Sequence, residues 1–266
     1  MKNSPICHSA MTPAFTETIL YQFSVQYFFC KPCGFLQTEK PYWLDKAYGD
    51  AIASSDTGLV QRNLLLASKL AVYLFLNLKP KASYLDIAGG YGILTRLMRD
   101  FGFNYFWSDP YCKNLHAVGF EKSDCKEKFH AISAFEVLEH VENPIEFITN
   151  QLKSNGCKTI ILSTDLFTGD QPPSTQWAYY SFSSGQHISF FSLQALEKIA
   201  KILNLNLYSF NKLHVLSDQP FRFGLLTRIL TKSYIAPIAA ILIRSRLGTK
   251  TYSDSETNIQ RNRPIA

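Results

Sequence analysis

The chain has 266 residues, of which 46% are apolar and 18% are charged, and its formal net charge is +6. This length fits one large domain or one domain with a small module. The composition excludes collagen-like, coiled-coil and wholly disordered chains.

Membrane spans are not expected, because every apolar stretch is shorter than the roughly 20 residues of a spanning helix. The two best candidates, residues 64–78 and 235–243, are interrupted by Lys69 and Pro237. The first residues lack the apolar core of a signal peptide, so the sequence predicts a cytoplasmic protein. Six cysteines in such a chain argue against a disulfide framework.

The N-terminal 40 residues are predicted to form a small zinc-ribbon-like module. Cys30 and Cys33 have the Cys-x-x-Cys spacing of a zinc knuckle, and Cys7 could supply a third thiolate. Ser4 stands where a complete ribbon has another cysteine, and His8 is too close to Cys7 to reach the same ion without strain. The three cysteines could therefore bind zinc, form a metal-free remnant of such a site, or be reduced surface thiols.

Strands and helices alternate along the rest of the chain. Pro144 suits the first turn of one predicted helix, and Ser192 suits the N-cap of another. The predicted strands are 21–29, 84–87, 105–107, 131–135, 158–162, 205–210 and 213–216, and the predicted helices begin near residues 59, 93, 144 and 193. The pattern predicts an α/β fold with a doubly wound, mostly parallel sheet at residues 80–217, after a linker and leading helix at 41–79.

A glycine-rich turn, DIAGGYG at residues 86–92, follows the strand at 84–87. Glycines at such a turn let the backbone approach a ligand closely. Asp109 follows the next strand, where an acidic side chain can accept hydrogen bonds from ribose hydroxyls. The glycine spacing fails the dinucleotide fingerprint, and there is no Walker-type Gly-Lys-Ser/Thr. Asp86 therefore suits a ligand with a cationic or amine group better than a pyrophosphate.

With these residues the chain resembles the class I S-adenosylmethionine-dependent methyltransferases, whose Rossmann-like fold has a seven-stranded sheet. Ala88 replaces the first glycine of their Asp/Glu-x-Gly-x-Gly-x-Gly pattern. The resemblance implies that Asp86 lies near the cofactor's amino group and that Asp109 holds its ribose. The cofactor-binding residues that it implies are Asp86, Ala88, Gly89, Gly90, Gly92, Asp109, Phe135 and Glu136. The N-terminal module is similar to zinc-ribbon modules that precede methyltransferase domains in some bacterial sugar- and natural-product-modifying enzymes.

A second group of candidate residues begins after the strand at 131–135. Glu136, Glu139 and His140 would share one face of a helical turn, and His187 lies in a later loop. Either histidine could act as a general base toward a substrate hydroxyl. Alternatively, the four groups could bind Mg²⁺ or Mn²⁺, in a pattern similar to metal-using O-methyltransferases of ubiquinone biosynthesis and of small-RNA 3′ ends. They could also be an exposed helix start with acidic residues near its N-terminus.

Aromatic residues surround His187 in the sequence. They could stack on a sugar, a quinone or a base, or they could form the packed core of their own segment. These residues are Trp177, Tyr179, Tyr180, Phe182, Phe190 and Phe191.

Residues 218–266 form a basic C-terminal extension, in which eight basic and three acidic residues give a charge of +5. Such an extension can attract phosphate, anionic lipid or an acidic partner, although a solvated terminal segment is the simpler interpretation. The last 18 or so residues, from about Gly248, are predicted to be disordered. Nucleic acid is not excluded as a partner, but the sequence has no recognised nucleic-acid module.

The sequence therefore predicts an S-adenosylmethionine-dependent methyltransferase that acts on a hydroxyl or carbon of a small molecule, such as a sugar or glycan precursor. The candidate metals are zinc in the N-terminal module and Mg²⁺ or Mn²⁺ at the Glu136/Glu139/His140/His187 group. One alternative is a metal-assisted O-methyltransferase of RNA or quinone. Another is a non-catalytic cofactor- or partner-binding protein on the same fold. The sequence does not indicate an oligomeric state.

Overall fold

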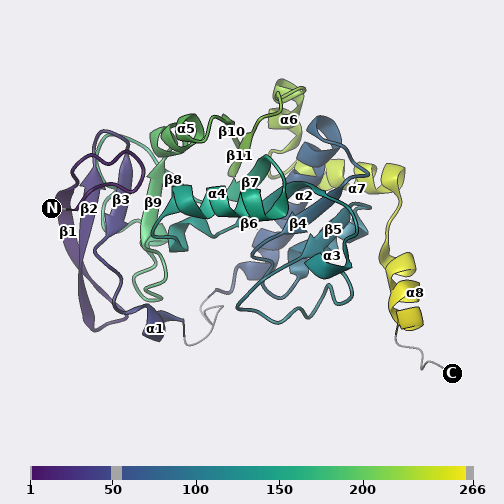
Figure 1. Cartoon of the computed structure of the whole chain (residues 1–266), viewed down its shortest axis with the longest axis horizontal. Coiled ribbons are helices and arrows are strands. Elements are labelled where there is room, and N and C mark those ends of the chain that lie inside the picture. The colour runs from purple at the N-terminus through teal and green to yellow at the C-terminus, as the bar shows by residue number, and fades with distance from the viewer. Residues whose placement is uncertain (1, 49–55, 262–266) are drawn as a thin grey trace. The chain divides into compact units, whose positions relative to one another are not determined.

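The computed structural model describes residues 2–48 and 56–261, which pack as two compact units (Figure 1). Of the described residues, the first unit comprises 2–48, 56, 134–154 and 158–219, and the second comprises 57–133, 155–157 and 220–261. The N-terminal strands and the later part of the predicted core thus share the first unit, and the glycine-rich turn and the C-terminal extension share the second.

The first unit contains a five-stranded sheet in the order β1-β2-β3-β9-β8 (Figure 1). The three N-terminal strands, β1 (Thr12–Ile19), β2 (Phe23–Cys30) and β3 (Phe35–Thr38), form an antiparallel meander. Strand β9 (Ser189–Ser192) pairs antiparallel with β3, and the short β8 (Leu166–Phe167) pairs parallel with β9. The N-terminal strands therefore share a sheet with residues far along the chain.

Aromatic side chains build much of the core beside this sheet. Tyr27 stacks on Phe15 with ring centroids 4.5 Å apart, and Tyr180 stacks on Phe182 at 5.1 Å. Phe190 is buried among these rings, and Trp177 packs against the same cluster. The aromatic segment is therefore packed in a core, as the simpler interpretation expected, but it shares that core with the N-terminal strands instead of forming one of its own.

The first unit also contains a three-stranded antiparallel arrangement, in which β11 (Leu213–Ser217) lies between β7 (Thr159–Ser163) and β10 (Asn206–Phe210). Its helices are α1 (Leu44–Ala47), α4 (Pro144–Asn155) and α5 (Leu193–Ile202), with short 3₁₀ turns η2 (Leu138–His140) and η3 (Ala178–Tyr180). Ser192 caps α5 as predicted, because its hydroxyl oxygen accepts a hydrogen bond from the Ala195 backbone N–H at 3.3 Å.

The second unit is built around β4 (Ser83–Asp86), which pairs in parallel with β5 (Asn104–Trp107) and with β6 (Phe129–Phe135). All four residues of β4 are buried, as expected for a central parallel strand. The helices are α2 (Leu59–Asn77), α3 (Ile93–Asp100), α6 (Gly224–Leu230), α7 (Ala236–Leu247) and α8 (Thr251–Arg261), with the 3₁₀ turn η1 (Lys122–Asp124). Helix α2 packs against α3, α6 and α7.

The α/β class is confirmed, but the strand pairing is mixed and does not give a clear seven-stranded parallel sheet. In the second unit β4 pairs parallel with β5 and β6, whereas in the first unit β11 pairs antiparallel with β7 and β10. Asn211 and Lys212 connect β10 to β11 with φ angles of 47° and 70°. A two-residue connection with positive φ at both positions is a hairpin turn, so it reverses the chain direction.

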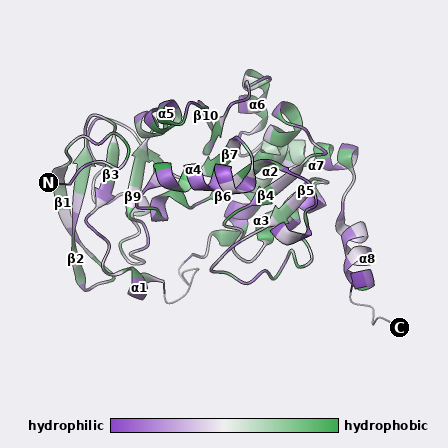
Figure 2. Cartoon of the chain, viewed as in Figure 1, coloured by the Kyte–Doolittle hydropathy of each residue, from purple (hydrophilic) through white to green (hydrophobic). Residues whose placement is uncertain are grey.

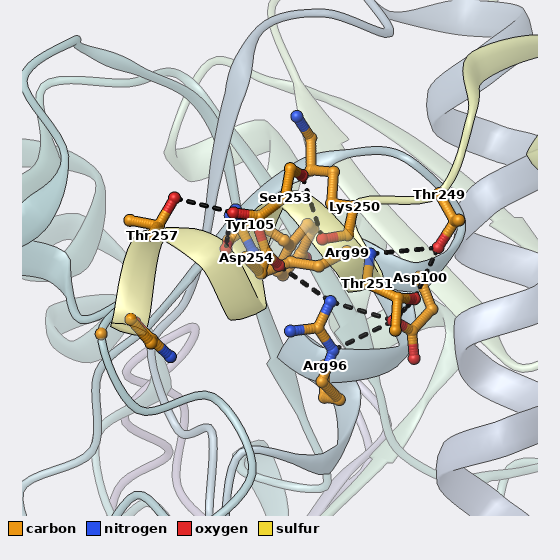
Figure 3. Close-up of polar contacts among 12 residues, drawn as sticks. Arg96, Arg99, Asp100, Tyr105, Thr249, Lys250, Thr251, Ser253, Asp254 and Thr257 are labelled. Carbon is orange, nitrogen blue, oxygen red and sulfur yellow. Dashed lines mark hydrogen bonds and ion pairs between the residues drawn. The ribbon is translucent and has the colours of Figure 1, made fainter. Parts of the chain in front are cut away.

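Helix α8 shows that the prediction of disorder after Gly248 is wrong for residues 251–261 (Figure 3). Asp254 is buried and forms a two-pronged ion pair with Arg99 of α3, in which both N–O distances are 2.7 Å. Arg96 approaches the same carboxylate at 2.9 Å. Because this segment is polar, its sequence did not indicate a helix. The buried Asp254 carboxylate and its two arginine partners hold this helix in place. Arg263 of the basic extension lies outside the described residues.

Among the described residues, only helix α2 has the length and apolar composition of a helix that could cross a membrane. The helix begins at Leu59, five residues before the candidate stretch 64–78, and is therefore longer than that stretch. Half of its apolar window is buried inside the structure, as in the core helix of a globular protein. These properties do not make α2 a clear membrane span.

Candidate active site

The glycine-rich turn connects β4 to α3 in the second unit. Gly90 and Gly92 have φ angles of 51° and 87°, in the left-handed region that favours glycine. A Cβ atom on Gly92 would lie 2.6 Å from the Asn114 side chain, and one on Gly89 would lie 2.3 Å from the Trp107 ring. The turn therefore needs glycine for its backbone conformation and for its close neighbours.

Asp86 ends β4 with its carboxyl group buried and only 2% of the residue exposed. The Ser133 hydroxyl donates a hydrogen bond to Asp86 Oδ1 at 2.9 Å, and the Tyr105 hydroxyl donates to Ser133 Oγ at 2.7 Å. Burial raises the pKa of Asp86 to about 7, and the nearby Asp109 charge adds to the rise. A bound ammonium group would favour the charged carboxylate and lower this pKa.

Asp109 follows β5 and ties the glycine-rich turn to the next loop. Its Oδ2 accepts a hydrogen bond from the Gly90 backbone N–H at 2.9 Å. Its Oδ1 accepts from the N–H groups of Tyr111 and Cys112 at 2.7 and 2.9 Å. A carboxylate can accept about four hydrogen bonds, so these three leave little capacity for a ligand. The contact of Asp109 with ribose stays a prediction, whereas its support of the turn is observed.

Sequence reasoning missed Ser133 and Tyr105, the hydroxyl residues that support Asp86. Ser133 interrupts the apolar run of β6, and a small polar residue near the carboxyl end of a buried strand was the available signal. Tyr105 resembles any buried strand residue in sequence. Phe135 ends β6 and Glu136 follows it in the first unit, so their cofactor contacts stay predictions.

The first unit brings together Glu139, His140 and His187, which we call the Glu–His cluster. One ligand atom from each residue lies within 4.8 Å of the others. The two imidazole rings are 5.0 Å apart between centroids and nearly perpendicular, at 82°. Residues 47 positions apart in sequence therefore meet, as the sequence suggested for a shared site.

Backbone carbonyls orient both histidines of the Glu–His cluster. His140 Nδ1 lies 3.0 Å from the Gln186 carbonyl oxygen and 3.0 Å from the Tyr48 hydroxyl oxygen. His187 Nδ1 lies 2.6 Å from the Tyr179 carbonyl oxygen. A carbonyl can only accept, so each Nδ1 carries the proton and each Nε2 presents a lone pair. This orientation is typical of metal-binding histidines.

Burial controls the protonation of the Glu–His cluster. It lowers the pKa of His140 to about 3, helped by the charge of His187, so His140 is neutral at physiological pH. Glu139 is fully buried, and its pKa rises to about 8 through burial and the charge of Glu136. Neither Glu139 oxygen accepts a hydrogen bond of normal geometry from a described residue, although the Tyr179 and Thr164 hydroxyls lie close enough to lower this pKa.

Glu136 departs from the predicted helical turn. It has a φ angle of 54°, and the turn itself begins only at Leu138. Ser163 Oγ donates a hydrogen bond to Glu136 Oε1 at 2.6 Å, so this carboxylate faces β7. The expectation that Glu136 shares a helical face with Glu139 and His140 is wrong, because the chain must first turn sharply out of β6.

A separate group of three cysteines also lies in the first unit. The sulfur atoms of Cys7, Cys30 and Cys33 lie within 4.8 Å of one another, and Cys7 Sγ is 3.4 Å from Cys30 Sγ. Ser4 Oγ lies 3.4 Å from Cys33 Sγ, at the position that the sequence comparison with a complete ribbon indicates. Three thiols at this spacing fit the donor set of a zinc ion with Zn–S distances of about 2.3 Å. His8 is not part of this group.

A family model of a methyltransferase domain matches residues 60–209, which is more than half of the chain. No curated protein matches the sequence.

Three solved structures illustrate the similarity to known folds. An O-methyltransferase family protein from Burkholderia thailandensis is 15% identical, with a TM-score of 0.48 and coverage of 68% of this chain and 63% of that chain. An O-methyltransferase family 2 protein from Planctomyces limnophilus, in complex with apigenin, is 17% identical, with a TM-score of 0.43 and coverage of 65% and 63%. A magnesium protoporphyrin IX methyltransferase from Synechocystis with bound SAM is 14% identical, with a TM-score of 0.37 and coverage of 65% and 87%. The chain spans about three fifths of the length of the first two.

Proposed function

Since the chain belongs to the methyltransferase-domain family, we propose that it is an S-adenosylmethionine-dependent methyltransferase that methylates a hydroxyl oxygen of a small molecule with the help of a divalent cation. The glycine-rich turn and Asp86 are proposed to bind the cofactor, and the Glu–His cluster is proposed to bind the cation. A sugar or glycan precursor is the acceptor we would test first. The cytoplasmic location stays a prediction.

The cofactor part of this proposal rests on the turn between β4 and α3. Gly90 and Gly92 give the turn its left-handed backbone conformation, and Gly89 and Gly92 let Trp107 and Asn114 pack closely against it. Asp86 offers a buried carboxylate to the amino group of the cofactor's methionine moiety, and Ser133 keeps that carboxylate oriented. Burial disfavours the ionised form of this carboxyl group. A bound ammonium group beside it would compensate the negative charge.

The buried carboxyl group of Glu139 carries the metal part of the proposal. A buried polar group without a hydrogen-bond partner is costly, and natural proteins rarely keep one without a functional reason. Here it lies beside two histidines that both turn Nε2 away from their carbonyl partners. Two neutral imidazoles and one carboxylate are a donor set that suits Mn²⁺ and other divalent ions.

Glu139, His140 and His187 would hold the cation, and when bound it lowers the pKa of a hydroxyl and orients it. The chain's own contribution is to keep both histidines in one tautomer and to keep water away from Glu139. Methyl transfer needs little further covalent chemistry, because the sulfonium donor is already activated and alignment supplies much of the rate.

A second candidate mechanism uses His187 as a general base. Its Nδ1 is held by the Tyr179 carbonyl at 2.6 Å, which leaves Nε2 as the proton acceptor. In this case His140 and Glu139 would only position His187, and turnover would not depend on a cation.

Calorimetry with Mn²⁺ separates the two mechanisms. Mn²⁺ is chosen because the cysteine group prefers softer ions such as Zn²⁺. We expect the wild-type protein to bind one Mn²⁺ outside the cysteines, and Glu139→Gln to weaken that binding by at least about tenfold. The control is Glu197→Gln on the exposed face of α5, which should bind Mn²⁺ as the wild type does.

S-adenosylhomocysteine binding is measured in the same samples. Retained binding in Glu139→Gln would show that its effect is confined to the Glu–His cluster. Absence of Mn²⁺ binding in the wild type, together with turnover that survives chelation, would exclude the metal mechanism and favour His187 as the base. Absence of S-adenosylhomocysteine binding would contradict the cofactor part independently.

A further inference from the structure

Helices α6 and α7 of the second unit expose large apolar side chains to solvent. On α7, Ile238, Ile241 and Leu242 are 63%, 62% and 64% exposed. On α6, Leu225 is 77% exposed and Leu226 is 44% exposed. The two helices that carry these side chains both pack against α2. We call these five residues the α6–α7 surface.

The opposite side of α7 explains why these side chains are exposed. Ala236, Ala239, Ala240 and Ile243 are buried and recur at helical spacing, and α7 packs against α2. Ile238, Ile241 and Leu242 lie on the side of the helix that α2 leaves uncovered. A helix that is apolar all round is normally buried all round, and Figure 2 shows α7 as mostly hydrophobic. The second apolar face of α7 therefore lacks a partner among the described residues.

Basic residues border this face. By helical periodicity, Arg244 and Arg246 stand on the two flanks of α7, between its buried and exposed rows, and both are exposed. Arg228 on α6 and Lys232 in the connecting turn are also exposed. Residues 219–253 contain six basic residues and no acidic residue. The α6–α7 surface is thus apolar in its centre and positively charged at its edges.

The pattern of an apolar stripe with flanking arginines fits the interface of an anionic lipid bilayer. The apolar side chains can enter the acyl boundary, while long basic side chains reach back to the headgroups. Helix α7 has 12 residues and a length of about 18 Å. It is too short to cross a hydrocarbon layer of about 30 Å, so it would lie along the surface.

Charge argues against a second copy of this chain as the partner. A symmetric dimer through this face would bring two acid-free basic segments against each other, and like charges at an interface are unfavourable. An anionic membrane supplies both the apolar layer and the opposite charge. We propose that the α6–α7 surface binds the enzyme peripherally to membranes that contain anionic lipids.

Vesicle flotation tests this proposal with the full-length protein. Vesicles of phosphatidylcholine are compared with vesicles of phosphatidylcholine mixed with phosphatidylglycerol, at low and high salt. We expect flotation with the anionic vesicles, little with the neutral ones, and a marked decrease at high salt because exposed charges are screened.

Two variants and one matched control identify the surface. Ile238→Ser combined with Ile241→Ser should reduce binding to anionic vesicles by about tenfold or more. Arg244→Gln combined with Arg246→Gln should reduce binding to anionic vesicles at low salt. The control is Leu193→Ser combined with Ile202→Ser on α5, where both native residues are 45% exposed and binding should be unchanged. Thermal unfolding and S-adenosylhomocysteine binding confirm that each variant is folded.

Several outcomes would overturn the proposal. These are the absence of flotation with anionic vesicles, equal flotation with neutral vesicles, and flotation that the isoleucine variant does not reduce. Sedimentation velocity tests the alternative partner, which is a second copy of this chain. A wild-type dimer that the isoleucine variant converts to a monomer, without vesicle binding, would assign the α6–α7 surface to self-association instead.

Discussion

Asp86 in the second unit and Glu139 in the first are both buried carboxyl groups whose pKa is raised by burial, to about 7 and about 8. They differ in what surrounds them. Asp86 accepts a hydrogen bond from Ser133, which is itself supported by Tyr105. Glu139 accepts no hydrogen bond of normal geometry from a described residue and lies beside two imidazoles instead.

This difference indicates what each carboxyl group is prepared to bind. A carboxylate that is already oriented by a hydroxyl needs only a positive group on its open side, such as the amino group of an organic ligand. A buried carboxyl group that accepts no hydrogen bond of normal geometry and has two imidazole rings close by is arranged as a ligand set for a cation. Asp254 completes the comparison, because it is buried in a site where arginines already compensate its charge.

Asp254→Asn should have the largest effect on stability. The substitution leaves the buried Arg99 guanidinium without its anionic partner, and breaking such a pair costs about 3–5 kcal/mol. Urea unfolding should show this loss, whereas the exposed neighbour changed by Glu256→Gln should lose less than about 0.5 kcal/mol. A loss as small as that of the control would mean that α8 contributes nothing to the second unit.

Asp86→Asn should strongly weaken cofactor binding. We expect the affinity for S-adenosylhomocysteine to fall roughly 100-fold, or about 2.7 kcal/mol, because the variant keeps the shape but loses the charge that attracts the amino group. Calorimetry on Asp86→Asn and Glu139→Gln checks the contrast between the two carboxyl groups. Equal weakening in both variants would show that they do not serve separate ligands.

Glu139 should make the metal-free protein less stable as the pH rises. Its pKa is about 8 in the folded protein against 4.5 for an unperturbed glutamate, so the folded state binds the proton more tightly between these values. The stabilisation is complete below the lower value and is lost as the pH approaches 8.

The difference between wild type and Glu139→Gln measures this effect. With chelator present, the unfolding free energy of the wild type should fall by about 3.5 kcal/mol more than that of Glu139→Gln between about pH 5 and pH 8. Asp86 titrates in the same direction but is present in both proteins, so it cancels in the difference. Parallel pH profiles would show that Glu139 is not held neutral by burial.

Ser133→Ala should have the smallest effect of the four. Loss of one hydrogen bond to the Asp86 carboxylate should weaken S-adenosylhomocysteine binding about fivefold, near 1 kcal/mol. The loss should be greater at pH 6 than at pH 8, because removing this donor raises the pKa of Asp86 further. Tyr105→Phe should weaken binding less, since Tyr105 acts on Asp86 only through Ser133. If Tyr105→Phe weakened binding more than Ser133→Ala does, Ser133 would not be part of the cofactor site.

Local sequence signals predicted most of the regular elements. The helix at α2, the strand and turn of β4, the cap at Ser192 and the hairpin strands β10 and β11 were all expected near their observed positions. The Cys7/Cys30/Cys33 group and the meeting of Glu139, His140 and His187 were also expected from spacing and residue type. The sequence did not predict where the 3₁₀ turn after β6 begins. Glu136 has a left-handed backbone conformation, which no sequence signal indicates in a non-glycine residue.

The sequence by itself determined where strands, helices and the glycine-rich turn form, because apolar periodicity and glycine or cap residues act over a few neighbouring positions. Only the tertiary structure decided which buried polar groups became partners. Ser133 reaches Asp86 across 47 positions of sequence, and Asp254 reaches Arg99 across 155. Such pairings depend on strand register and helix docking, which bring distant residues into one low-dielectric environment where each polar group must find a partner.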